Sequence, residues 1–152
     1  MTKKTLIAFT AGMAMGAIAF AAADNIGKGK VIRQAPSKVS PNGKALATPL
    51  VTQDIGAQNA YMGLLSIAPG AKVPKHKDST EEMLYFIQGG GTVTIDGTDY
   101  AVSQNDAIYM PANAEVSFQN HPQNQSIVLQ VFAGMGPEAK YNTWQWKPLQ
   151  SQ

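Results

Sequence analysis

The chain contains two histidines and no cysteine, and one of the histidines stands close to carboxylates. His76 and Asp78 are separated by one residue, and side chains two apart on an extended strand point to the same face. An imidazole beside a carboxylate can ligate a divalent cation or transfer a proton. The other histidine, His121, lies beside Pro122 in an expected turn. We therefore do not expect it to complete a site with His76.

The elements that position these groups are predicted to be strands. From Leu46 onward, short apolar runs are interrupted by Gly, Pro, Asn and Asp about every ten residues, a pattern typical of an all-β sandwich or barrel. Asp96-Gly97 is a type I′ hairpin signal, and Pro69-Gly70 is a second turn signal. The expected strands are Ala47–Thr52, Ala60–Ile67, Ala71–Lys75, Met83–Gln88, Thr92–Ile95, Thr98–Val102, Ala107–Met110, Glu115–Gln119 and Ser126–Phe132.

The N-terminus differs in composition from the rest. Lys3 and Lys4 precede an apolar run that ends in small residues, which predicts a signal peptide over residues 1–23 with cleavage after Ala23, or alternatively after Ala21. An uncleaved membrane anchor is the alternative, because the run is only slightly shorter than the about 20 residues of a span. Either reading places the domain outside the cytoplasm, as a periplasmic or secreted protein.

The rest of the chain divides into three expected parts. Residues 24–45 form a flexible arm, residues 46–134 a single β-barrel domain, and residues 135–152 a tail. The tail carries Tyr141, Trp144 and Trp146, so we expect it to pack on the barrel or on a dimer partner. After removal of residues 1–23, ten basic residues face ten acidic ones. That balance argues against nucleic acid and anionic membranes as partners.

Two segments resemble the motifs of the cupin superfamily. Residues 70–89 are similar to its first motif, G-x5-H-x-H-x3-E-x6-G, with Gly70, His76, Glu82 and Gly89 at the motif spacing. Asp78 stands where the motif has its second histidine. Alternatively, that histidine is deleted and Asp78 is an acidic residue of the loop. The resemblance implies an all-β, single-domain jelly-roll barrel.

The second motif, G-x5-P-x-G-x2-H-x3-N, resembles residues 105–120. Pro111 and Asn120 match it, whereas Asn105 and Asn113 replace glycines and Val116 replaces the remaining histidine. Asparagine also enters the left-handed backbone region readily, so the fold tolerates the first two changes. Valine cannot ligate a metal. The resemblance therefore covers about residues 46–134 and implies an incomplete metal site.

Cupins that bind metal usually hold it with three histidines and one glutamate. Here the resemblance leaves His76, Asp78 and Glu82, a more anionic set that favours Mn²⁺, Fe²⁺, Zn²⁺ or Ca²⁺, weakly held. The site also has readings without metal. Asp78 is then a turn residue before a polar loop, and His76 and Glu82 bond to each other or to water.

Side chains on the same strand face as Glu82 and Val116 are expected to line the mouth of the barrel, namely Leu84, Phe86 and Phe118, with Asn120 as a polar point. Tyr85 and Tyr109 are also expected to contact the ligand. Such a largely apolar cavity suits a small organic ligand. We therefore expect an exported cupin that binds a small organic ligand, with or without a divalent metal.

Two other functions remain open. The first is a metal-dependent oxygenase, isomerase or lyase that uses His76, Asp78 and Glu82, with Tyr85 or Tyr109 as an acid. The second is a structural module in which the barrel serves a homodimer interface. The strand Ser126–Phe132 is apolar on both faces apart from Gln130, which favours such an interface.

Overall fold

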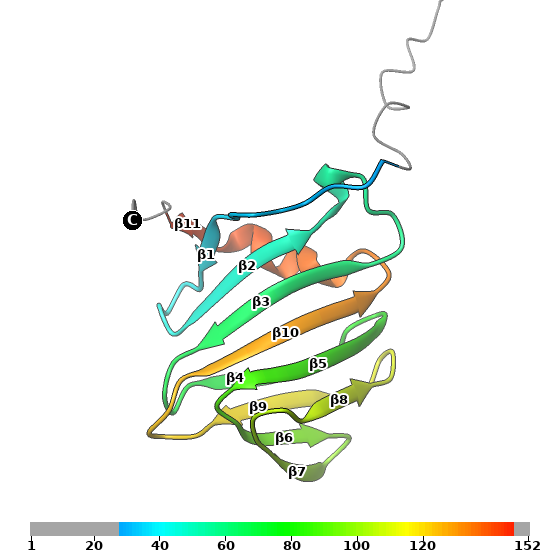
Figure 1. Cartoon of the computed structure of the whole chain (residues 1–152). Coiled ribbons are helices and arrows are strands. Elements are labelled where there is room, and N and C mark those ends of the chain that lie inside the picture. Colours follow the sequence, from blue (N-terminus) through cyan, green and yellow to red (C-terminus); the bar gives the residue numbers. More distant parts are fainter. Residues whose placement is uncertain (1–27, 148–152) are drawn as a thin grey trace, which may run out of the picture.

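The computed structural model describes residues 28–147 (Figure 1). Two β-sheets make up most of this part of the chain. The seven-stranded sheet has the order β11-β1-β2-β3-β10-β5-β8, and the four-stranded sheet has the order β4-β9-β6-β7. The strands are β1 (Ser37–Val39), β2 (Ala45–Val51), β3 (Tyr61–Ile67), β4 (Lys72–His76), β5 (Glu81–Gln88), β6 (Gly91–Ile95), β7 (Thr98–Val102), β8 (Ala107–Met110), β9 (Val116–Asn120), β10 (Ser126–Ala133) and β11 (Gln145–Lys147).

The nine strands expected from the sequence are present as β2 to β10, each within about two residues of its expected ends. The hairpin between β6 and β7 turns at Asp96 and Gly97, whose φ angles are 46° and 82°. These positive angles are those that a type I′ turn requires. The two asparagines in place of motif glycines also adopt positive φ, 74° at Asn105 and 65° at Asn113. All-β architecture is therefore shown.

The structure differs from the expectation of a loose arm up to residue 45. Residues Ser37–Val39 form β1, which pairs with β2 and with β11 of the tail, and β2 begins at Ala45. A three-residue strand carries too little alternation to be recognised in the sequence. One of its two partner strands, β11, lies about a hundred residues away in the sequence, and only the tertiary fold brings it near.

The strand pairing forms two packed sheets rather than one closed barrel. The edge strands are β11 and β8 in the seven-stranded sheet and β4 and β7 in the four-stranded sheet, and no ladder joins the two sheets. Within residues 28–147 the all-β cupin fold is therefore present as two packed sheets, without a continuous ladder that closes them into one barrel.

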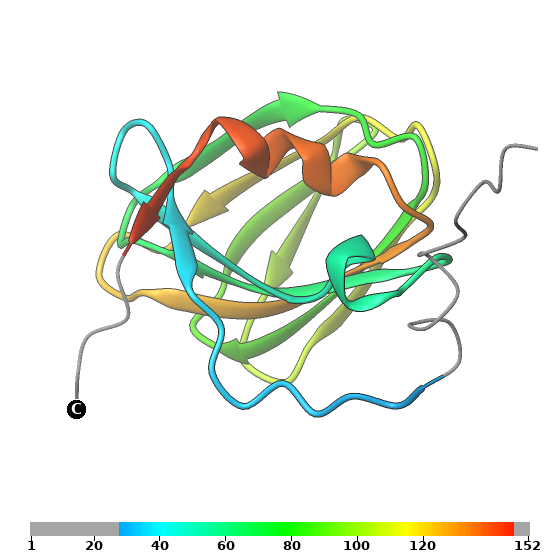
Figure 2. The same ribbon diagram turned by 90° about the horizontal axis from the view of Figure 1, so that it is seen from above.

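The tail packs against the seven-stranded sheet. The 3₁₀ helices of the described chain are η2 (Gln53–Ile55) and η3 (Pro137–Thr143), and η3 lies alongside the ring of strands when the molecule is viewed from above (Figure 2). Tyr141 of η3 is 4% exposed and packs near Tyr61 and Phe132, and Trp144 meets the Tyr141 ring edge-on at 4.9 Å. Tyr141 and Trp144 therefore extend the core of their own chain, whereas Trp146 is 59% exposed.

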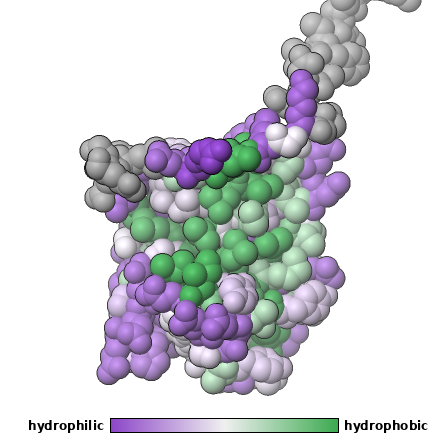
Figure 3. Space-filling model, viewed as in Figure 1, coloured by the Kyte–Doolittle hydropathy of each residue, from purple (hydrophilic) through white to green (hydrophobic). Residues whose placement is uncertain are grey.

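The main core lies between the two sheets. Phe86 from β5 and Phe118 from β9 approach with ring centroids 5.7 Å apart, and Val93 and Val128 pack with them. On the outer face of the seven-stranded sheet, alternate residues of β3, β5 and β10 form an apolar surface (Figure 3). No helix within residues 28–147 is long and apolar enough to cross a membrane.

Candidate functional site

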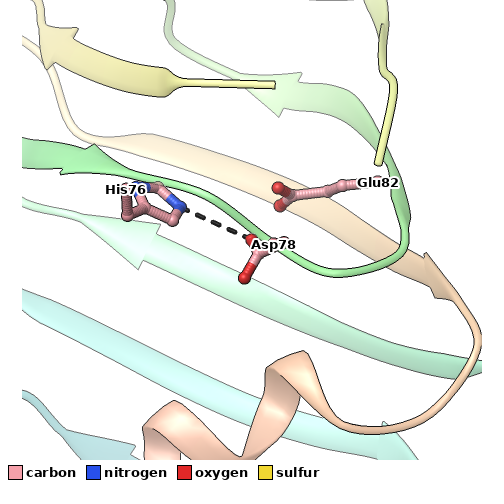
Figure 4. A group of neighbouring side chains, drawn as sticks. All are labelled: His76, Asp78 and Glu82. Atoms are coloured by element: carbon pink, nitrogen blue, oxygen red, sulfur yellow. Dashed lines mark ion pairs between the residues drawn. The ribbon is translucent and has the colours of Figure 1, made fainter. Parts of the chain in front are cut away.

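Three side chains with metal-binding groups converge where β4 leads into β5. His76 ends β4, Asp78 lies in the connection, and Glu82 is the second residue of β5 (Figure 4). One ligand atom from each residue lies within 4.8 Å of the others. Strands β4 and β5 belong to different sheets, so the chain crosses from one sheet to the other in this short connection. The crossing directs His76 and Glu82 toward the same point.

The ring of His76 is oriented by its own strand. Nδ1 lies 2.9 Å from the carbonyl oxygen of Pro74, which can only accept, so Nδ1 carries a hydrogen. Nε2 then faces Oδ2 of Asp78 at 3.5 Å. A bare nitrogen and an ionised carboxylate would repel each other, so this geometry calls for a proton or a cation between them. The hydrogen bond with Asp78 accordingly raises the pKa of His76.

Asp78 is held by a second cation. Its side chain is 9% exposed, and the ammonium nitrogen of Lys140 lies 2.8 Å from Oδ1 and 2.7 Å from Oδ2. Burial acts to raise the pKa of Asp78, but the hydrogen bonds from His76 and Lys140 outweigh it and lower that pKa. The side chain bonds Lys140 rather than capping the loop that follows, so the reading as a turn residue does not describe it.

Glu82 is 5% exposed and belongs to a different hydrogen-bond chain. Its Oε1 accepts from Nε2 of Gln130 at 2.6 Å, and Oε1 of Gln130 accepts from the hydroxyl of Tyr141 at 2.8 Å. Burial raises the pKa of Glu82, and it also raises the pKa of Tyr141 well above the ordinary value. Glu82 therefore bonds Gln130, not His76, and the Gln130–Tyr141 hydrogen bond holds Gln130 in the position that orients the carboxylate.

These groups fit a divalent cation in donor type and separation. Ligands on one ion at about 2.0–2.2 Å lie about 3–3.5 Å apart, close to the 3.5 Å between His76 and Asp78. The hydrogen bond from Nδ1 to a carbonyl is the usual support of a metal-bound histidine. Val116, which pairs with His76 in the β4–β9 ladder, places an apolar wall where the family has its last histidine. An ion bound there would supply Lewis acidity, with water in its remaining positions.

A cavity of about 400 Å³ lies between the sheets and reaches this cluster. His76, Glu82, Gln130 and Lys140 line it at one end. The rest of the wall is mainly apolar, including Leu65, Leu84, Phe86, Val93, Phe118 and Val128. The cavity thus combines a mainly apolar wall with the charged groups of this cluster, and Lys44 and Lys72 line it as well.

The expected ligand-binding residues divide into two groups. Phe86 and Phe118 line the cavity as expected. Tyr85 and Tyr109 do not, because they lie on the outer face of the sheet, 41% and 54% exposed, with hydroxyls bonded to Asn105 and Glu81. Residues of β5 alternate, so Tyr85 points away from the face that carries Phe86. Neither tyrosine can act as an acid in the cavity.

Asn120 is buried but lies outside the cavity wall. Its Nδ2 contacts the carbonyl oxygens of Ile67, Ala68 and Asn124 at 2.7–3.0 Å. Its Oδ1 accepts from the hydroxyl of Ser126 at 2.7 Å. All of its polar groups are therefore used in joining strands, and the role of Asn120 is structural rather than ligand-binding.

Three residues of the site were missed by sequence reasoning: Gln130, Lys140 and Tyr141. Gln130 could have been found from the sequence, because it is the one polar residue within the apolar run 127–132. Lys140 carried none, because a single lysine in a polar tail is ordinarily a solvated surface charge. Tyr141 was noted only as an aromatic anchor, and its hydroxyl contact depends on the path of η3.

Known proteins agree with this architecture. The Cupin domain family model matches residues 63–132. The chain is 28% identical to the polyketide synthase CurC of Streptomyces cyaneus, over 55% of this chain and 56% of that protein. It is 32% identical to the dimethylsulfoniopropionate lyase DddW of Ruegeria pomeroyi, over 38% of each. The chain thus spans about half, or less, of the length of these relatives.

Among solved structures, the polyketide cyclase RemF from Streptomyces resistomycificus superposes with a TM-score of 0.65 at 16% identity. The superposition covers 81% of this chain and 88% of that one. At this identity the likeness concerns the fold alone. Together with the motifs and the sheet topology, these matches establish that the chain belongs to the cupin superfamily.

Proposed function

We propose that this protein is an exported cupin that binds a small, mainly apolar organic molecule between its two sheets. The polar end of the ligand lies at His76 and Glu82, and a divalent metal is weakly held there. The observation that carries the proposal is the cavity of about 400 Å³ whose apolar wall ends at this cluster. Pockets of this size and lining are typical of small-molecule sites.

The relatives support a ligand of this kind. CurC and RemF are named for polyketide chemistry, and DddW is named a lyase of dimethylsulfoniopropionate. All three are named for reactions of organic molecules. The low identity leaves the ligand of this chain to be identified from its own cavity.

A fluorescence titration with N-phenyl-1-naphthylamine, a neutral apolar probe, tests the proposal. Leu65 lines the cavity, whereas Leu64, one position away on β3, faces the opposite side of the sheet. We expect saturable binding that Leu65→Phe weakens at least tenfold and that Leu64→Phe leaves within twofold. Equal loss in both variants, or no binding by the wild-type protein, would refute the proposal.

A second function is favoured by the three converging ligand atoms: a metal-dependent enzyme of the oxygenase, isomerase or lyase class. Elemental analysis of protein purified without a metal-affinity column tests it, with His76→Ala and Glu82→Ala as variants. About one metal per chain, lost in both variants, supports an enzyme and leads to assays for oxygen uptake and elimination. Absence of metal in all three proteins, even after incubation with Mn²⁺ or Zn²⁺, excludes it.

A further inference from the structure

Lys140 occupies the position of a cation within the cluster of potential metal ligands. Its ammonium nitrogen contacts both oxygens of Asp78, at 2.8 and 2.7 Å. The nitrogen also lies 4.9 Å from the centroid of the Phe132 ring, in a cation–π contact. The lysine side chain is 32% exposed, so it is held at the site without being enclosed.

A metal ion and Lys140 compete for the same carboxylate. Both oxygens of Asp78 are engaged by the ammonium, and a metal ligand must offer at least one of them to the ion. An ion placed between His76 and Asp78 would also bring two positive charges close to Lys140. Repulsion between the ion and the ammonium therefore favours withdrawal of Lys140 from Asp78 when the ion binds.

The withdrawn ammonium remains beside the cavity. Lys140 lines the cavity together with Glu82, whereas Asp78 is not part of its wall. Glu82 is an acceptor for Gln130 and is itself a potential metal ligand, so with a metal bound it is not free to pair with the lysine. An acidic group on a bound ligand would give the displaced ammonium of Lys140 an anionic partner.

We propose that Lys140 is an exchangeable cation: it neutralises Asp78 in the metal-free protein, and a divalent ion displaces it toward the cavity, where it pairs with the acid group of an anionic apolar ligand. This inference rests on the proposed function, because it places that ligand in the same cavity. It predicts that metal and an anionic ligand assist each other's binding, since each takes one half of the Asp78–Lys140 pair.

The first test measures Zn²⁺ affinity by isothermal titration calorimetry. Lys140→Met keeps the length of the side chain and its contact with Phe132 but removes the charge. We expect it to bind Zn²⁺ at least tenfold more tightly than wild type, whereas Lys140→Arg stays within threefold. The matched control is Lys75→Met, which removes another lysine–carboxylate pair, the exposed Lys75–Glu115 contact at 2.8 Å. Unchanged or weaker Zn²⁺ binding by Lys140→Met would overturn the inference.

The second test compares two probes that differ by one sulfonate group. Saturating Zn²⁺ should strengthen binding of 1-anilinonaphthalene-8-sulfonate at least fivefold and leave N-phenyl-1-naphthylamine within twofold. In Lys140→Met the effect of Zn²⁺ on the sulfonate probe should disappear. If the effect persists there, the sulfonate binds the metal directly and the assigned role of Lys140 is wrong.

The two proposals fail in different ways. If the neutral probe does not bind, the proposed function fails, and the ligand half of this inference fails with it. If the neutral probe binds but Zn²⁺ leaves the affinity for the sulfonate probe unchanged, only the inference fails.

Discussion

Gln130 and Glu82 form a buried pair in which the amide nitrogen donates to the carboxylate over 2.6 Å. The two residues come from neighbouring strands, β10 and β5, and lie diagonally across the ladder, where Gln130 is opposite Leu84 and Glu82 is opposite Phe132. The amide cannot neutralise the charge of the carboxylate. Glu82 is therefore a group whose ionisation works against folding, and its pH dependence distinguishes it from Asp78.

Substitution Glu82→Gln should stabilise the metal-free protein at neutral pH. The pKa of Glu82 is raised by burial in the folded state, so its contribution to stability is complete below the unfolded pKa and is lost as pH rises through the folded pKa. The variant does not lose this stability, because its glutamine side chain does not ionise. Urea unfolding with chelator present should show an advantage for the variant at pH 7 that vanishes toward pH 4. A constant advantage at all pH values would contradict this account.

Asp78→Asn should have the opposite dependence on pH. The pKa of Asp78 is lowered because the hydrogen bonds from His76 and Lys140 outweigh its burial. Its contribution to stability is therefore present above the unfolded pKa and is lost as pH falls through the folded pKa. In the same urea experiment, the variant should be less stable than wild type at pH 7. The deficit should shrink in strongly acidic buffer, and a deficit that grows on acidification would be incompatible with the ion pair.

Asn120→Ala should destabilise the fold without changing the ligand site. The substitution leaves buried carbonyl groups of Ile67 and Ala68 and the hydroxyl of Ser126 without their partner. We expect a loss of about 3 kcal/mol in the free energy of unfolding. The affinity of the folded fraction for N-phenyl-1-naphthylamine should stay within twofold of wild type. A tenfold loss of affinity at unchanged stability would show instead that Asn120 contacts the ligand.

The export proposal predicts a shorter mature protein. Expressed with its own N-terminus in a Gram-negative host, the chain should appear in the periplasmic fraction and begin at Asp24. Intact-mass measurement identifies the N-terminus, and a control with Lys3 and Lys4 changed to glutamate should reduce processing. Residues 1–23 lie outside the described part of the structure. Recovery of only full-length chain in the membrane fraction would indicate an anchor instead.

We also propose that the chain forms a homodimer through the apolar outer face of β3, β5 and β10 (Figure 3). Leu129 points to this face, between buried residues of the opposite phase. The variant Leu129→Lys should be a monomer, and the wild-type protein a dimer, in light scattering at micromolar concentration. The circular dichroism spectrum should remain unchanged. The control is Lys72→Glu on the free edge of β4, which should leave the mass unaltered. A wild-type monomer at 100 µM would refute the proposal.

Several features followed from local sequence. Nine strands and the Asp96-Gly97 hairpin were predictable because side-chain alternation and turn preferences act over a few residues. The spacing of His76, Asp78 and Glu82 likewise placed them together, since His76 ends β4, Glu82 is the second residue of β5, and Asp78 lies in the short connection between them. The outward position of Tyr85 was also available from the alternation that places Glu82 and Phe86 inward. Its assignment to the cavity was an error of strand phase.

The tertiary structure decided what no local pattern could. Lys140 reaches Asp78 across 62 residues, and Tyr141 reaches Glu82 only through Gln130 on another strand. These contacts require η3 to lie against the seven-stranded sheet. The pairing of β11 with β1 holds the chain beyond η3 on the same sheet. Such long-range pairing is set by the whole fold and leaves no periodic trace. The sequence therefore determined the sheets and the ligand cluster, and the fold determined which cation the cluster holds.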